Sequence, residues 1–228
     1  MGVYMKTVQV NGVSLAYAEE GAGKPVILLH GNGGSHNDLQ RQISQLVEAG
    51  YKVYAPDSRG QGANAALPEY HYADMAEDIF QFVRALGISR PAIYGWSDGG
   101  IVALLVEVLH PGTAGMLAVS GANASPDAMS ESFKQQAREE YAETGNPLIK
   151  LMLEEPHITE EQLGGITAPV LVAAGSEDLI PLDHTLLIAN SLPNSQLVIV
   201  EGEDHFSYIV ESPIMGNLLV DFLEEHGY

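Results

Sequence analysis

Gly95-Trp96-Ser97-Asp98-Gly99 is the stretch of sequence that decides the fold. This Gly-x-Ser-x-Gly segment follows a short apolar run and precedes an apolar stretch with helical character at 99–109. Between a strand and a helix, the pattern predicts a nucleophile elbow, a strained turn that exposes the serine hydroxyl. The glycines are needed because side chains there would collide with neighbouring backbone. The pattern can arise by chance in a chain with 24 glycines, so its strand–helix setting carries the prediction.

A serine hydroxyl needs a base to remove its proton. His205 is the candidate base, because it follows the predicted strand 196–200 by a short polar turn. Asp178 is the candidate acid that orients the imidazole, because it follows the strand 170–174 and lies between Ser97 and His205 in chain order. Active sites of open α/β sheets gather at the carboxyl ends of the strands. The weaker acidic alternatives are Glu177, Asp183 and Asp204, the last of which suits a turn.

The segment His30-Gly31-Asn32-Gly33-Gly34-Ser35 follows another apolar strand, at 25–30. An oxyanion hole needs two preorganised N–H donors. We expect these donors to be the backbone N–H groups of Asp98 and Asn32, with Gly31 allowing the backbone to approach the substrate. On this segment alone, a plain glycine-rich turn remains an open alternative.

Five segments together resemble the α/β-hydrolase superfamily over nearly the full length of the chain. They are HGNGG at His30, PDSRGQG at Pro56, GWSDGG at Gly95, ITAPVLVAAGSEDLIP at Ile166 and SLPNSQLVIVEGEDHF at Ser191. The resemblance implies an eight-stranded, mainly parallel sheet, the triad Ser97–Asp178–His205 and no cofactor. GWSDGG is also similar to the elbow of the biphenyl-hydrolase-like and amino-acid-ester hydrolase branch.

Short apolar runs alternate with amphipathic stretches along the chain, which predicts βαβ units with helices on both faces of the sheet. We expect one α/β domain over 1–228, with a short helical lid inserted at about 121–165. Asn11-Gly12 predicts a hairpin between strands at 3–10 and 13–19. The other predicted strands are 25–30, 52–55, 92–95, 114–120, 170–174 and 196–200, and the predicted helices are 38–49, 72–86, 99–109, 182–191 and 213–225.

Apolar residues of the lid are candidates for an acyl pocket, although most suit helix packing equally well. They are Met129, Phe133, Leu148, Ile149, Met152 and Leu153. Of these, Phe133 and Met152 are the expected substrate contacts, together with Gly31 and Trp96 beside the elbow.

Two alternatives are open for the Asp98 side chain beside the nucleophile. The carboxylate could attract the ammonium group of an amino-acyl ester, or it could turn inward and pair with a neighbour. Asp57 and Arg59 suit a structural turn, and His30 suits a buried hydrogen-bonded position.

The composition limits which partners and cofactors the protein is expected to bind. Thirty acidic against ten basic residues give a formal charge of −20, which disfavours nucleic acid and anionic membranes. The chain has no cysteine, and its eight histidines show no metal-binding spacing, so neither metal nor cofactor is expected. Without an apolar run of ~18 residues or a signal sequence, we expect a cytoplasmic protein, with a homodimer possible.

The sequence therefore predicts a serine hydrolase that cleaves small carboxylic esters through an acyl-enzyme on Ser97. Amidase, lactonase and thioesterase activities use the same machinery and remain alternatives. A non-catalytic ligand-binding homologue is the alternative from another class of protein.

Overall fold

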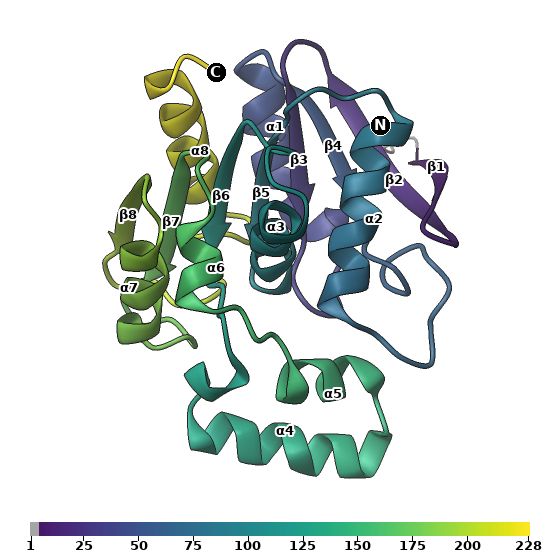
Figure 1. Ribbon diagram of the computed structural model, residues 1–228, viewed down its shortest axis with the longest axis vertical. Coiled ribbons are helices and arrows are strands. Elements are labelled where there is room, and N and C mark those ends of the chain that lie inside the picture. The colour runs from purple at the N-terminus through teal and green to yellow at the C-terminus, as the bar shows by residue number, and fades with distance from the viewer. Residues whose placement is uncertain (1–4) are drawn as a thin grey trace.

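An eight-stranded sheet runs through the computed structural model, which describes residues 5–228 (Figure 1). The order across the sheet is β1-β2-β4-β3-β5-β6-β7-β8. The β1/β2 and β2/β4 pairings are antiparallel and all others are parallel. The strands are β1 (Met5–Val10), β2 (Val13–Gly21), β3 (Pro25–Leu29), β4 (Lys52–Pro56), β5 (Ala92–Trp96), β6 (Met116–Ser120), β7 (Val170–Gly175) and β8 (Ser195–Val200). The predicted α/β-hydrolase fold with a mostly parallel sheet is confirmed.

The opening hairpin forms at the predicted turn. Asn11 and Gly12 both have positive φ, 43° and 78°, as a primed two-residue turn requires. Val10 pairs with Val13 across it. Residues 3 and 4 of the predicted first strand lie outside the described part of the chain.

Helices cover both faces of the sheet (Figure 1). One face packs against α2 (Tyr72–Ala85), α3 (Asp98–Leu109), α6 (Glu160–Gly164) and α7 (Leu182–Ser191), and the other against α1 (Gln40–Glu48) and α8 (Ile214–Glu225). Central strands are buried on both sides, which explains why they read as continuous apolar runs in the sequence.

The segment expected to form the lid divides into two parts. The short helix η2 (Pro126–Ala128), α4 (Glu131–Thr144) and α5 (Pro147–Glu154) project from the layered body (Figure 1). In contrast, α6 rejoins the body, because Leu163 is fully buried in the core against α7. The projecting part is therefore shorter than the predicted block at 121–165.

Side-chain hydrogen bonds explain two further differences in boundaries. The helix expected from residue 38 begins earlier, as the 3-10 helix η1 (His36–Leu39), because Ser35 and Asp38 form a capping box. The strand expected from residue 114 begins at Met116, since the Ala114 N–H donates to the Glu107 carboxylate instead of to a neighbouring strand.

Candidate active site

Ser97 lies at the junction of β5 and α3 in a strained conformation, with φ 56° and ψ −119°. Its backbone N–H donates to Ser120 O at 2.8 Å, and its side chain is partly exposed. A Cβ at Gly95 would collide with the Gly99 carbonyl, and one at Gly99 with the Leu29 carbonyl. The sequence therefore forms this turn only with glycines on both sides of the serine.

His205 and Asp178 meet at the ends of β8 and β7. His205 Nδ1 lies 2.7 Å from Asp178 Oδ1, and the imidazole is buried. Asp178 Oδ1 also accepts from the Ile180 N–H at 2.9 Å, which fixes the carboxylate. Because an ionised carboxylate only accepts hydrogen bonds, Nδ1 carries the proton and Nε2 is left as a base.

Gly121 brings this pair next to the elbow. It directly follows Ser120, whose carbonyl binds the Ser97 N–H, and a Cβ at Gly121 would lie 2.7 Å from His205 Cε1. The Trp96 indole N–H also donates to the His205 carbonyl at 3.0 Å. Within residues 5–228 Ser97 Oγ has no hydrogen-bond partner, as is common for catalytic hydroxyls before substrate binds. The fold thus places the imidazole of the base against Gly121, one residue from the carbonyl that binds the Ser97 N–H.

The expected oxyanion loop lies against the nucleophile. A Cβ at Gly31 would be 3.4 Å from Ser97 Cβ and 3.3 Å from the Trp96 ring, so the loop passes close to the nucleophile and a larger side chain there would be tightly packed. The Asp98 N–H belongs to the first turn of α3, where amides have no partner within the helix. This arrangement places the loop of Asn32 and the start of α3 on either side of Ser97.

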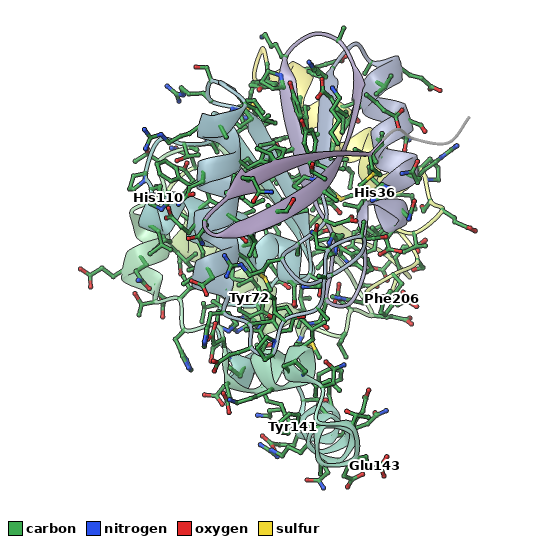
Figure 2. All side chains as sticks on the ribbon, turned by 90° about the vertical axis from the view of Figure 1, so that its right-hand side faces the viewer. His36, Tyr72, His110, Tyr141, Glu143 and Phe206 are labelled. Carbon is green, nitrogen blue, oxygen red and sulfur yellow. The ribbon has the colours of Figure 1, made fainter. Side chains whose placement is uncertain are left out.

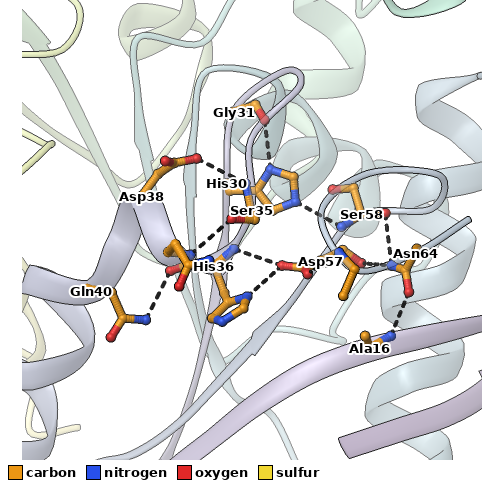
Figure 3. A network of polar contacts seen from close by, with 12 residues as sticks. Ala16, His30, Gly31, Ser35, His36, Asp38, Gln40, Asp57, Ser58 and Asn64 are labelled. Carbon is orange, nitrogen blue, oxygen red and sulfur yellow. Dashed lines mark hydrogen bonds and ion pairs between the residues drawn. The ribbon is translucent and has the colours of Figure 1, made fainter. Parts of the chain in front are cut away.

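A network of hydrogen bonds between buried polar groups supports the loop at 30–35 (Figure 3). The Ser58 N–H donates to His30 Nε2 at 2.9 Å, so His30 carries its proton on Nδ1 and donates to Gly31 O at 2.7 Å. Burial lowers the pKa of His30, which keeps the imidazole neutral. Asp57 accepts from the backbone and the ring of His36, each at 2.8 Å. His30 and Asp57 therefore have structural roles.

Asp98 is turned inward, in agreement with one of the two alternatives. Its carboxylate is buried and accepts from Asn32 Nδ2 at 2.8 Å. Burial is the largest influence on this group and raises its pKa to about 6. The Tyr72 hydroxyl, which is also buried, lies beside this carboxylate and opposes the rise in its pKa. The carboxylate therefore lies inside the protein.

The remaining predicted substrate contacts are dispersed. Trp96 is buried and holds the backbone of His205. Phe133 on α4 and Met152 on α5 are partly exposed, and their contact with substrate stays a prediction.

Two residues near the base were missed by sequence reasoning. Phe206 is 54% exposed, yet its ring packs edge-on against both Trp96 and His205, with centroids 5.5 and 5.1 Å apart. It lies on the main body, away from Tyr141 and Glu143 at the far end of the lid (Figure 2). Gly121 is the second residue that sequence reasoning missed. Its only signal in the sequence is that a glycine directly follows a strand at the carboxyl edge of the sheet.

Across residues 5–228 no group of three or more His, Asp or Glu side chains could hold a metal. Among the helices of the same range, none has both the length and the apolar character needed to cross a bilayer.

Comparison with known proteins agrees with this geometry. Residues 24–149 match the family model described as the alpha/beta hydrolase fold, and the chain belongs to this family of hydrolases. The putative carbamate hydrolase RutD of Variovorax paradoxus is 27% identical over 88% of this chain and 92% of its own length. The human serine hydrolase BPHL is 27% identical over 95% of this chain and 85% of its own length.

A solved structure shows the same fold. The esterase from Thermogutta terrifontis superposes with a TM-score of 0.82 and 21% identity, and the match covers 96% of this chain and 98% of that one. At this level of identity the likeness extends to the fold alone.

Proposed function

We propose that this protein is a serine hydrolase that cleaves small carboxylic esters through an acyl-enzyme on Ser97. The observation that carries the proposal is the Asp178–His205 pair, held at 2.7 Å beside the strained elbow of Ser97. Nucleophile, base and orienting acid follow the chain order of the α/β-hydrolase fold.

Each group has a defined role in the proposed reaction. Ser97 Oγ attacks the ester carbonyl while His205 Nε2 takes its proton, and Asp178 stabilises the resulting imidazolium. The backbone N–H groups of Asp98 and Asn32 bind the oxyanion. The tetrahedral intermediate expels the alcohol, which takes the proton from His205. Water then attacks the acyl-enzyme with His205 as base, which releases the carboxylic acid and restores Ser97.

Ester cleavage is favoured by the short lid and is compatible with the similarity to the human serine hydrolase BPHL. Amide, lactone and thioester cleavage use the same groups and are the alternatives, as is ligand binding without turnover. We also propose a small-molecule substrate, no nucleic-acid or membrane partner and a cytoplasmic location, in keeping with the formal charge of −20.

A substrate screen tests the proposal. Purified protein is assayed on simple acyl esters, amino-acyl esters, amides, lactones and thioesters, with Ser97→Ala as the blank. We expect ester turnover that falls on the order of 10⁶-fold in kcat in the variant. Near-normal esterase activity in Ser97→Ala would remove the assignment, and binding without turnover by the unmodified chain would favour the receptor alternative.

A further inference from the structure

The side chain of Asn32 connects three parts of the molecule. Its amide nitrogen donates to Asp98 Oδ2 at 2.8 Å and to the carbonyl of Leu148, on lid helix α5, at 3.3 Å. The two protons of one amide group thus bind the residue after the nucleophile and the first turn of helix α5. The backbone of the same asparagine supplies a proposed oxyanion donor.

We propose that the Asp98 carboxylate is a positioning residue, which holds the Asn32 loop and lid helix α5 in the geometry that stabilises the oxyanion. The inference rests on the proposed function and deepens it: Asp98 acts on the reaction through Asn32, and its carboxylate does not contact the substrate.

Burial and pairing of the carboxylate support this role. Asp98 is 6% exposed, and its hydrogen-bond partner is a neutral amide from within the protein. The Tyr72 hydroxyl beside it is fully enclosed, which closes the site from the side of α2. Burial of a charged carboxylate without a cationic partner costs free energy of folding. A carboxylate kept in this state next to the nucleophile therefore points to a functional role that offsets the cost.

The same geometry has a consequence for specificity. A carboxylate that already accepts from Asn32 and lies inside the protein is not free to bind a substrate ammonium. Simple acyl esters and amino-acyl esters should therefore depend equally on Asp98. Recognition of an ammonium group would instead make only the amino-acyl esters depend on it.

Three variants and a double mutant test the inference. Asp98→Ala removes the acceptor, Asp98→Asn keeps a neutral acceptor, and Asn32→Ala removes the amide while keeping the backbone N–H. Because a small misplacement of a catalytic group costs up to about 10²-fold, we expect Asp98→Ala to lower kcat by about 10- to 100-fold with little change in KM. Asp98→Asn should recover to within about threefold. The double variant should lose no more than Asn32→Ala alone, since both remove one link.

The matched control is Glu107→Ala at the other end of α3. Glu107 is also buried and accepts from the Gly112 and Ala114 N–H groups, so its loss destabilises the protein without touching the elbow. Its kcat at a temperature well below unfolding should equal that of the unmodified protein. A kcat loss as large as that of Asp98→Ala would show that destabilisation alone explains the effect.

The rate at which a fluorophosphonate modifies Ser97 separates this inference from the proposed function. Modification of the unmodified protein with a slowed rate in Asp98→Ala and Asn32→Ala supports the inference, even if no ester in the screen is turned over. Unchanged modification rates in both variants would overturn the inference on Asp98 but leave the assignment of Ser97 as the nucleophile intact. A KM increase confined to amino-acyl esters, or additive losses in the double mutant, would also overturn it. Absence of any modification of the unmodified protein would contradict the proposed function itself.

Discussion

The carboxyl edge of the sheet and the projecting lid are built in different ways. At the edge, Ser97 and Asp178 follow fully buried strands and His205 follows the outer strand β8, which is exposed or half-buried, and backbone hydrogen bonds fix the turns that carry them. In the lid, α4 is mostly exposed and buries only Lys134 and Ala137 along its length. Geometry at the edge is set by close packing, whereas the lid meets the body through a few apolar residues, Leu148, Leu151 and Ile158, and a small number of polar contacts.

The polar contacts of the lid lie at the ends of its segments. The Ala124 N–H donates to His184 Nε2 at 2.9 Å, and the Ala124 carbonyl accepts from the Ile158 N–H at 2.8 Å, which joins the entry and exit of the lid. Leu148 accepts from Asn32, as described above. The difference teaches that substitutions at the sheet edge should affect the chemistry, whereas substitutions in the lid should affect selectivity and local stability.

The largest expected effect comes from Gly121→Ala at the sheet edge. Gly121 has a positive φ of 57°, and the new methyl group would meet the His205 ring at 2.7 Å. Because displacement of the base by about 1 Å costs about 10²-fold, we expect kcat on esters to fall by at least that factor. Steady-state kinetics on the best ester of the screen measures it.

Gly145→Ala in the lid is the matched control for this change. Gly145 has nearly the same φ, 63°, but a Cβ there meets no atom within 4 Å. It should cost about 1–2 kcal/mol of local stability from backbone strain and leave kcat within about twofold. Equal kcat losses in the two glycine variants would contradict the contrast between edge and lid.

A smaller effect is expected in the pH dependence of stability. Burial raises the folded-state pKa of Asp98 from the ordinary value of 3.8 to about 6. A raised carboxyl pKa favours the protonated folded state, so stability from this group is present below about pH 4 and is lost as pH rises to about 6. Asp98→Asn cannot ionise and should gain up to about 3 kcal/mol relative to the unmodified protein between pH 4 and 8.

Urea unfolding at the two pH values measures this gain. Asp78→Asn is the control: burial also raises the pKa of Asp78, but Asp78 pairs with Arg59, so neutralisation leaves a buried guanidinium without its partner and should destabilise the protein at pH 8. A stability difference between Asp98→Asn and the unmodified protein that stays constant over this range would contradict the prediction.

The smallest effect concerns the exit of the lid. Glu155 accepts from the Tyr72 N–H at 3.0 Å and lies 2.6 Å from His71 Nδ1, and this hydrogen bond raises the pKa of His71. The stabilisation is therefore present below about pH 6.5 and is lost as pH rises through the raised pKa of His71. Because the pair is partly exposed, we expect it to contribute less than about 1 kcal/mol.

Hydrogen exchange of α5 measures the effect. Protection should be higher at pH 5.5 than at pH 8.5, after correction for intrinsic rates, and Glu155→Gln should remove the difference. Glu77→Gln, which removes the partner of His110 outside the lid, is the control that should leave it intact. Loss of the pH-dependent difference in protection in both variants would show that the His71–Glu155 pair does not cause it.

The sheet could be predicted from sequence because its strands are short apolar runs between clear turn signals. The hairpin at Asn11-Gly12 formed as expected. The extent of the lid could not be predicted, because the attachment of α6 to the body depends on its contacts with α7, which are distant in sequence.

The site, like the fold, could be predicted only in part from the sequence. Chain order and position after a strand were enough to select Asp178 and His205, which the structure brings together. Gly121 and Phe206 lie near the base through tertiary packing; a glycine directly after a strand is the only signal for the first, and the sequence holds none for the second. The pairing of Asp98 with Asn32 joins residues 66 positions apart, and a single chain without relatives gives no signal for such a contact.

One measurement tests the central claim most directly: intact-mass analysis and peptide mapping after treatment with a fluorophosphonate probe, with His205→Ala in parallel. The account predicts one adduct for each chain, located on Ser97, and modification slowed by several orders of magnitude in the variant. An unmodified chain, an adduct on another residue, or equal rates with and without the imidazole would contradict it.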